Sequence, residues 1–275
     1  MTNQSDIPYT LVSIRFSHYV EKIRWVLDLN STPFREIPLM PVAHFVVSPI
    51  YVGLSGKTDG HSTRFSTPII KGPDGVMSKS TSIAQYLDNK HFDKASSLFK
   101  DPKAAELDMY YTNYLGPHTR RLFYYNVLNQ PSEIRFLCEK NVGMSQRLLF
   151  NGFFSVMRKQ IIGSLRVSEK NTKKSIDYIY QEFDKVNDLL KDGRPFILGD
   201  QFSMADISFA CMGGAITLPT PEEGYGAVLP RLNGPNNTLR EVSRDLRDSP
   251  AGKWALSLFA NHRGKRAVHA KPNLS

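Results

Sequence analysis

The chain has 275 residues, of which 41% are hydrophobic and 22% are charged, a balance typical of soluble globular proteins and sufficient for two ordinary domains. No stretch approaches the roughly 18 apolar residues that a membrane-spanning helix needs, and the first residues do not resemble a secretory signal, so we expect a cytoplasmic protein with no membrane partner. The net charge of +9 is dispersed and accompanies no nucleic-acid-binding motif, so we expect no nucleic-acid partner.

The two cysteines, Cys138 and Cys211, lie far apart and form no C-x-x-C pair. Zinc sites and redox dithiols need closely spaced ligands, so the sequence predicts no metal site. Free cysteine is among the most often buried residue types, and we expect both side chains to be reduced and packed in the core.

The first part of the chain alternates between strand and helix patterns. Short runs rich in β-branched and aromatic residues predict strands at residues 9–16 and 34–40. Apolar residues at helical spacing lie between them, and charged residues line another face of the same helix. The apolar positions are Val20, Ile23, Val26 and Leu27, and the charged positions are Glu21, Arg24 and Asp28.

A loop rich in Gly, Ser and Thr follows, and the next segment predicts a hairpin and a helix. The turn is Gly-Pro-Asp-Gly at residues 72–75, where Pro presets one dihedral angle and Gly accepts a positive φ. A strand over residues 68–71 precedes it, another short strand follows it, and a helix opens at Ser80. The order β-α-β then β-β-α predicts one small domain over residues 1–92.

After a polar stretch at residues 92–101 the strand patterns stop, and residues 102–262 predict an all-helical domain. Residues 175–190 show one continuous apolar stripe, formed by Ile176, Ile179, Phe183, Val186 and Leu190. The basic segment 263–275 follows the last helical pattern, and we expect it to be a solvated, disordered tail.

Three local features have ordinary structural interpretations. Ser203 and Asp206 have the spacing of a capping box at a helix start. Pro68 opens a short strand, where its missing N–H is tolerated and a trans bond is the simple interpretation. Ser17 and Ser80 each stand at a predicted helix N-terminus, where capping is the usual role of serine, although two such N-termini could also converge on an anion.

In combination these features resemble the glutathione S-transferases, over about residues 8 to 261. The segment RPFILGDQFSMADISFA is similar to the family's helical-domain signature, and STPIIKGPDGVMSKSTSIAQYL is similar to its proline loop and γ-glutamyl-binding corner. SPAGKWALSLFANHR is similar to the final helix of bacterial-type members. The resemblance implies an α/β, thioredoxin-like N-terminal domain that binds glutathione, followed by an all-α domain that binds the electrophile.

The resemblance gives Ser17 a catalytic role, because the family places Ser, Cys or Tyr at the exit of the first strand. A thiol of pKa about 8.5 can be drawn down by a hydroxyl hydrogen bond and a helix N-terminus. A cysteine there would form mixed disulfides with glutathione, whereas serine suits conjugation. The chain therefore resembles a serine-dependent transferase of bacterial or fungal type, with glutathione as co-substrate, no metal, and a small hydrophobic electrophile as the detoxified substrate.

Other glutathione-binding positions carry over from the same resemblance, which also implies a cis bond between Thr67 and Pro68. Thr67 would offer its backbone to the cysteinyl part of glutathione. Ser80 would offer its hydroxyl and N–H to the γ-glutamyl carboxylate. Arg64 or Lys57 would meet the glycine carboxylate.

Lys79 departs from the family, in which an acidic residue before the Ser-Thr pairs with the α-amine of glutathione. Either Lys79 turns outward while a carboxylate of a partner subunit takes the amine, or the natural ligand lacks the amine. The electrophile pocket would be lined by Tyr110, Tyr111, Tyr114 and His118, although aromatic residues at that spacing are also typical of a helix core. Tyr9 lies too early in its strand for the catalytic role, and His18 is interpreted as a loop residue.

The family also implies a two-fold homodimer built across both domains. An alternative function stays open, because the same fold serves as a non-catalytic module that binds apolar ligands or a partner protein.

Overall fold

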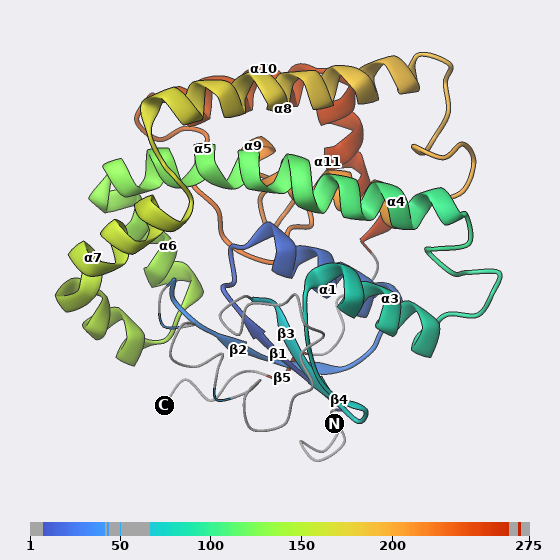
Figure 1. Cartoon of the computed structure of the whole chain (residues 1–275), viewed down its shortest axis with the longest axis horizontal. Coiled ribbons are helices and arrows are strands. Elements are labelled where there is room, and N and C mark those ends of the chain that lie inside the picture. The colour runs from blue at the N-terminus through green and yellow to red at the C-terminus, as the bar shows by residue number, and fades with distance from the viewer. Residues whose placement is uncertain (1–7, 42, 44–49, 51–66, 264–268, 271–275) are drawn as a thin grey trace.

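The structure is a computed structural model that describes residues 8–41, 43, 50, 67–263 and 269–270. The first half contains β1 (Tyr9–Ser13), α1 (His18–Leu29), β2 (Phe34–Pro38), β3 (Ile69–Gly72), β4 (Gly75–Ser78) and α3 (Ser80–His91). This is the β-α-β then β-β-α order that the sequence predicts. The sheet lies at the bottom of Figure 1, and α1 and α3 lie between it and the helices of the second half.

The sheet of the described residues has five strands in the order β4-β3-β1-β2-β5. β1 and β2 are parallel, whereas β3 is antiparallel to both β1 and β4. The fifth strand, β5 (His269–Ala270), pairs in parallel with β2 and was not predicted, because two residues carry no readable periodicity.

Three residues of the predicted basic tail are therefore described. Arg263 is buried, and His269–Ala270 form β5. The other tail residues lie outside the described part of the chain, so their disorder stays a prediction.

The second half is all-helical, as predicted. Its elements are α4 (Pro102–Tyr110), the π-helical segment η2 (Tyr111–Leu115), α5 (Gly116–Asn129), α6 (Pro131–Asn141), α7 (Met144–Ser164), α8 (Glu169–Leu190), α9 (Met204–Thr217), α10 (Thr238–Asp248) and α11 (Pro250–His262). The predicted apolar stripe of α8 faces the core: Ile179, Phe183 and Val186 are buried, and Ile176 and Leu190 pack against the same cluster.

The predicted capping box starts α9. The backbone N–H of Ser203 donates to Oδ2 of Asp206 at 2.7 Å, and the Ser203 hydroxyl accepts from the helix backbone. The other carboxylate oxygen of Asp206 accepts from the N–H of Ile197 at 2.7 Å, so one side chain fixes both the helix start and the preceding loop. Every residue of α9 is buried, which makes it the central helix of this half.

One hydrophobic core joins the two halves. Trp25 of α1 is fully buried, its ring lies 4.6 Å from that of Phe259 in α11, and its Nε1 donates to the carbonyl of His262 at 3.0 Å. Cys138 and Cys211 are buried and unpaired within this core, as predicted. Because α1 packs on the sheet below and on α9 and α11 above, its N-terminus has a fixed position (Figure 1).

Candidate functional site

The sheet register brings the predicted glutathione-binding segments to one edge. In the antiparallel pairing, Val12 near the end of β1 lies opposite Ile69 at the start of β3. Ile69 in turn lies opposite Ser78 at the end of β4. The chain therefore leaves β1, enters β3 and leaves β4 at the same edge of the sheet, and both α1 and α3 begin there.

Ser17 is the N-cap residue of α1, but its hydroxyl does not cap the helix. Its backbone is extended, with φ −74° and ψ 125°, and its carbonyl accepts from the N–H groups of Val20 and Glu21 at 3.0 Å each. The side chain makes no hydrogen bond to the first turn and is half-buried. The Ser17 hydroxyl therefore does not perform the capping role that serine usually has at a helix N-terminus.

The loop that carries Ser17 is held from both sides. The N–H of Ser17 donates to the carbonyl of Ile14 at 2.8 Å, and Nη2 of Arg24 donates to the carbonyl of Arg15 at 2.8 Å. The Ser13 carbonyl accepts from the N–H of Leu39 at 2.7 Å. These bonds fix the backbone between β1 and α1, and with it the position of the Ser17 hydroxyl.

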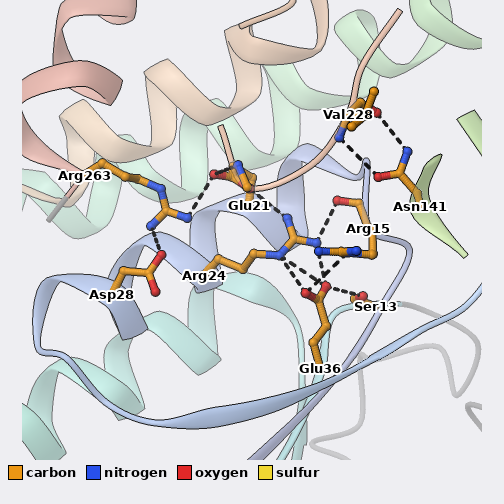
Figure 2. A network of polar contacts seen from close by, with 10 residues as sticks. Ser13, Arg15, Glu21, Arg24, Asp28, Glu36, Asn141, Val228 and Arg263 are labelled. Carbon is orange, nitrogen blue, oxygen red and sulfur yellow. Dashed lines mark hydrogen bonds and ion pairs between the residues drawn. The ribbon is translucent and has the colours of Figure 1, made fainter. Parts of the chain in front are cut away.

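Arg24 belongs to a buried network of charges beside this loop (Figure 2). Its guanidinium lies 2.7 Å from Glu21 and 2.6 Å from Glu36, and the Ser13 hydroxyl donates to Glu36 at 2.5 Å. Burial alone would lower the pKa of Arg24, but the two carboxylates outweigh it and raise that pKa. Burial would likewise raise the pKa of Glu36, but Arg24 lowers it. Both groups therefore stay ionised.

The network continues into the second half of the protein (Figure 2). Arg263, just after α11, lies 3.1 Å from Glu21 and 2.6 Å from Asp28, the latter an ion pair without hydrogen-bond geometry. The N–H of Gly226 donates to Glu21 at 3.0 Å. Asn141 holds the same loop by exchanging hydrogen bonds with both backbone groups of Val228. The charged face of α1 is thus an interface between the two halves and not a solvated surface.

The proline loop enters β3 through a cis peptide bond between Thr67 and Pro68, as the resemblance implied. Pro68 is buried and Thr67 is half-buried. Arg64 and Lys57, the two candidates for the glycine carboxylate, lie outside the described residues.

Lys79 and Ser80 mark the start of α3. Lys79 is the N-cap residue, is half-buried and has a φ of 78°, a conformation that non-glycine residues rarely adopt. Ser80 is the first helical residue and is buried. Backbone strain of this kind often marks a ligand-binding position, and here it lies at the sheet edge where Ser17 and Pro68 also lie.

His18 is the first residue of α1 and is buried, so its interpretation as a loop residue is wrong. Its ring lies 4.3 Å from that of Tyr19. Burial, with Arg120 nearby, lowers the pKa of His18 to about 3. A hydrogen bond to the backbone of Gly116 opposes this shift, so the imidazole donates it, and Nε2 has no hydrogen-bond partner among the described residues. His18 is therefore neutral, and its Nε2 is left without a partner among the described residues.

The second half meets the start of α1 through η2 and α5. The ring of Phe16 stacks on Phe123 at 6.0 Å, and the guanidinium of Arg120 lies 5.4 Å from the centre of the Tyr19 ring. The Tyr19 hydroxyl donates to the carbonyl of Thr112 at 3.3 Å. Ser17 lies between Phe16 and Tyr19 in sequence, so α5 covers the segment that presents it.

A break in the helix hydrogen bonding makes the bond between the Tyr19 hydroxyl and the Thr112 carbonyl possible. Gly116 donates to the carbonyl five residues earlier, and the next bond of this π-helical type would run from residue 117 to the carbonyl of Thr112. Residue 117 is proline and has no N–H, which leaves that carbonyl to the Tyr19 hydroxyl. A Cβ at Gly116 would lie 2.6 Å from the Tyr19 oxygen, so the close approach requires glycine.

The four predicted pocket residues make contacts within the helical half, and their role in a pocket stays a prediction. The Tyr110 hydroxyl donates to Glu182 of α8 at 2.7 Å, and the exposed ring of Tyr114 stacks on that of Tyr110. Tyr111 is buried against Phe209 of α9. His118 bonds to Ser175 of α8 at 3.0 Å and its ring lies against Tyr178. These contacts are those of helix packing, which accounts equally well for aromatic residues at this spacing.

A cavity of about 540 Å³ lies elsewhere, between α6 and the loop after α9. Phe136, Leu218, Val228, Leu229 and Leu232 form its apolar wall, and Lys140, Glu222 and Arg231 contribute charged groups. None of the residues at the sheet edge lines it. Within the described part of the chain, no helix is long and apolar enough to span a bilayer. The same residues contain no cluster of His, Cys, Asp and Glu that could hold a metal ion.

Comparison with known proteins gives a match in the second half. A family model described as "Glutathione S-transferase, C-terminal domain" matches residues 170–253. A search of curated proteins found no match.

Many solved structures match over most of the chain. A glutathione S-transferase of Ceriporiopsis subvermispora, solved with glutathione, is 17% identical, with a TM-score of 0.59 over 92% of this chain and 96% of its own. Poplar glutathione transferase F1 is 16% identical, with a TM-score of 0.52 over 92% and 99%. A glutathione S-transferase of Methylobacterium radiotolerans, in complex with glutathione sulfonate, is 20% identical, with a TM-score of 0.50 over 90% and 94%. At these identities the likeness shows a shared fold.

Proposed function

We propose that the chain is a member of the glutathione S-transferase superfamily, that it binds glutathione at the sheet edge where α1 and α3 begin, and that it transfers the thiolate to small hydrophobic electrophiles. The observation that carries this proposal is the convergence of Ser17, Pro68 and Ser80 on that edge. Two of the structures reported above contain glutathione or its sulfonate, which supports the choice of ligand.

The N-termini of α1 and α3 supply the electrostatics of the proposed site. The N–H groups of the first turns of both helices have no partners within the helix, and the helix dipole favours a negative charge there. In the proposed complex the first turn of α3, with Ser80, binds the γ-glutamyl carboxylate, and the backbone of Thr67 before Pro68 binds the cysteinyl part. Arg64 remains the proposed partner of the glycine carboxylate.

Ser17 is the proposed catalytic residue. Its hydroxyl makes no capping bond, so it can donate to a sulfur at the start of α1. A hydrogen bond to the thiolate, together with the helix N-terminus, stabilises the charged form and lowers the thiol pKa. In the reaction the thiol proton goes to solvent, the sulfur forms a bond to the electrophilic carbon, and that carbon loses its leaving group with the bonding electrons. Binding both reactants in one site contributes several kcal/mol of the remaining barrier reduction.

We further propose a cytoplasmic role in detoxification and a two-fold homodimer, in which a carboxylate of the partner subunit could take the glutathione α-amine. Because Lys79 stands where the family has an acidic residue, we keep a second candidate function, that of a non-catalytic binding module. If the site does not accept that amine, the protein is a binding module of the same fold, which holds an apolar ligand or a partner protein without catalysis.

The test is retention of the protein on immobilised glutathione, followed by an assay of conjugation to chlorodinitrobenzene. We expect retention, elution by free glutathione, and turnover above the uncatalysed rate. Retention without turnover of several aryl halides would favour the binding module, and failure to bind glutathione at all would reject the proposal.

A further inference from the structure

Arg120 is a half-buried cation at the candidate site with no counter-ion among the described residues. Four other arginines each have a carboxylate: Arg24 pairs with Glu21 and Glu36, Arg240 with Glu133, Arg247 with Glu223 and Arg263 with Asp28. Arg121, Arg147 and Arg158 are half-buried and donate to uncharged acceptors. Arg120, in contrast, has no ion pair or hydrogen bond to a described residue, and its Nε is buried without a partner. Such a group is costly to bury and is the preferred protein partner of a carboxylate.

The neighbours of Arg120 do not supply that partner. The Tyr19 ring lies under the guanidinium, at 5.4 Å, and adds attraction but no acceptor for its N–H groups. His18 is neutral, with its Nε2 unused. Lys22, another cation near His18, already bonds to Asp108 at 2.6 Å. Among the described residues beside Ser17, Arg120 is therefore a positive charge without a counter-ion, and it comes from the second half of the protein.

Aromatic side chains lie near this charge. The Tyr19 ring lies under the guanidinium, Phe123 follows Arg120 by about one turn of α5, and the Phe123 ring stacks on that of Phe16. An arginine next to flat apolar rings suits a ligand with an aromatic body and one anionic substituent, because the rings contact the body while the guanidinium forms two parallel hydrogen bonds to a carboxylate.

We infer that Arg120 binds the carboxylate of the second substrate, so that the enzyme prefers aryl acids with a reactive carbon over the corresponding neutral compounds. This inference rests on the proposed function. For a chloronitrobenzoate, the glutathione sulfur forms a bond to the chlorine-bearing ring carbon, chloride leaves with the bonding electrons, and the thiol proton passes to solvent. The benzoate carboxylate stays ionised on Arg120 throughout.

The experiment compares kcat/KM for a chloronitrobenzoate and for its methyl ester, each divided by its uncatalysed rate with glutathione. Wild type should prefer the acid, and Arg120→Met should lower that preference by about 10-fold or more, which corresponds to the loss of a charge-assisted pair. Arg120→Lys should retain part of it. Arg121→Met is the matched control and should leave the preference unchanged, because Arg121 bonds to Leu165 at the end of α7 and to Ser175 of α8.

An unchanged preference in Arg120→Met would overturn the inference. So would a higher KM for glutathione at an unchanged preference, because that result would assign Arg120 to a carboxylate of glutathione itself. Should Arg120→Met fail to fold, the same comparison is made with Arg120→Gln.

Binding of unreactive nitrobenzoate, measured by calorimetry, separates the two proposals. Binding by wild type that is weakened in Arg120→Met but not in Arg121→Met supports the anion site even if no aryl halide is turned over. Failure of wild type to bind nitrobenzoate, with glutathione conjugation intact, would reject the anion site and leave the transferase standing.

Discussion

The ammonium group of Lys22 in α1 lies 2.6 Å from Oδ1 of Asp108 in α4, and both side chains are buried. The same carboxylate oxygen accepts from the hydroxyl of Ser208 in α9 at 2.5 Å, and Lys22 also donates to the Thr112 hydroxyl at 2.9 Å. Three helices of the two halves thus meet at one buried ion pair. Removing one member leaves the other charge buried without its counter-ion, which is costly.

We therefore predict that Lys22→Met lowers the free energy of unfolding by about 3 to 5 kcal/mol, since Asp108 is left charged and buried. The double variant Lys22→Met with Asp108→Leu should recover a large part of the loss. Lys185→Met, which breaks the more exposed pair with Glu182, is the control and should change stability little. Denaturant titration measures all of these variants, and a loss in Lys22→Met no larger than in the control would contradict the prediction.

Ser17→Ala should lower the conjugation rate by about 10-fold or more and change the glutathione dissociation constant much less, because the hydroxyl bonds the thiolate and contributes little to holding the peptide. Tyr9→Phe is the control. The Tyr9 hydroxyl lies 2.7 Å from Nε2 of His91, so it already has a partner away from Ser17. Steady-state kinetics at neutral pH with separate calorimetry distinguishes rate from affinity. Activity of Ser17→Ala within about a factor of two of wild type would show that another group activates the thiol.

Lys79→Asp tests how the site treats the α-amine of glutathione. If Lys79 faced that amine at about 4 Å, the repulsion would be on the order of 4 kcal/mol at an effective dielectric constant near 20, or roughly three decades in affinity. We expect only a small change on calorimetric titration, because the rest of the corner is intact and a long side chain can turn outward. Lys71→Asp, an exposed position on the same hairpin, controls for the change in net charge. A large gain in affinity confined to Lys79→Asp would favour the binding-module function.

Acidification should destabilise the protein through His18. Its folded pKa is about 3 and the unfolded value is 6.5, so below pH 6.5 the unfolded state takes up a proton that the folded state excludes. The stabilising contribution is complete above pH 6.5 and is lost as the pH falls toward 3. Between pH 7 and pH 5 the loss is about 2 kcal/mol.

His18→Gln keeps a donor for the Gly116 backbone and cannot titrate, so its unfolding free energy should fall less between pH 7 and pH 5 than that of wild type. Other titrating groups are common to both proteins and cancel in the difference. Parallel slopes in urea titrations at the two pH values would show that His18 is protonated in the folded state.

The sequence predicts the fold well because each element has a local cause. The hairpin follows from Pro73 and Gly75, the start of α9 from Ser203 and Asp206, and the buried side of α8 from its apolar stripe. The positions of Ser17, Pro68 and Ser80 at one edge follow from the sheet register, which the sequence indicates only through its resemblance to a known family.

The contacts between the halves could not be predicted in the same way. The pattern of α1 shows a charged face, but only the structure shows that Arg263, far away in sequence, neutralises it. Arg120 and His18 belong to no sequence motif. Their contacts depend on how α5 packs across the start of α1. The bonds of Tyr110 and His118 to Glu182 and Ser175 join residues far apart in the sequence, so no local pattern predicts them.

The fluorescence of Trp25 can report the contact between the two halves of the protein. The chain has two tryptophans, and Trp254 on α11 is half-buried with its Nε1 bonded to the carbonyl of Pro195. Trp25 is fully buried between Phe259 and Arg263, so its indole meets water only when α1 separates from the end of α11. In a protein whose second tryptophan is replaced by phenylalanine, the emission maximum would therefore report docking of the two halves separately from the helix content seen by circular dichroism.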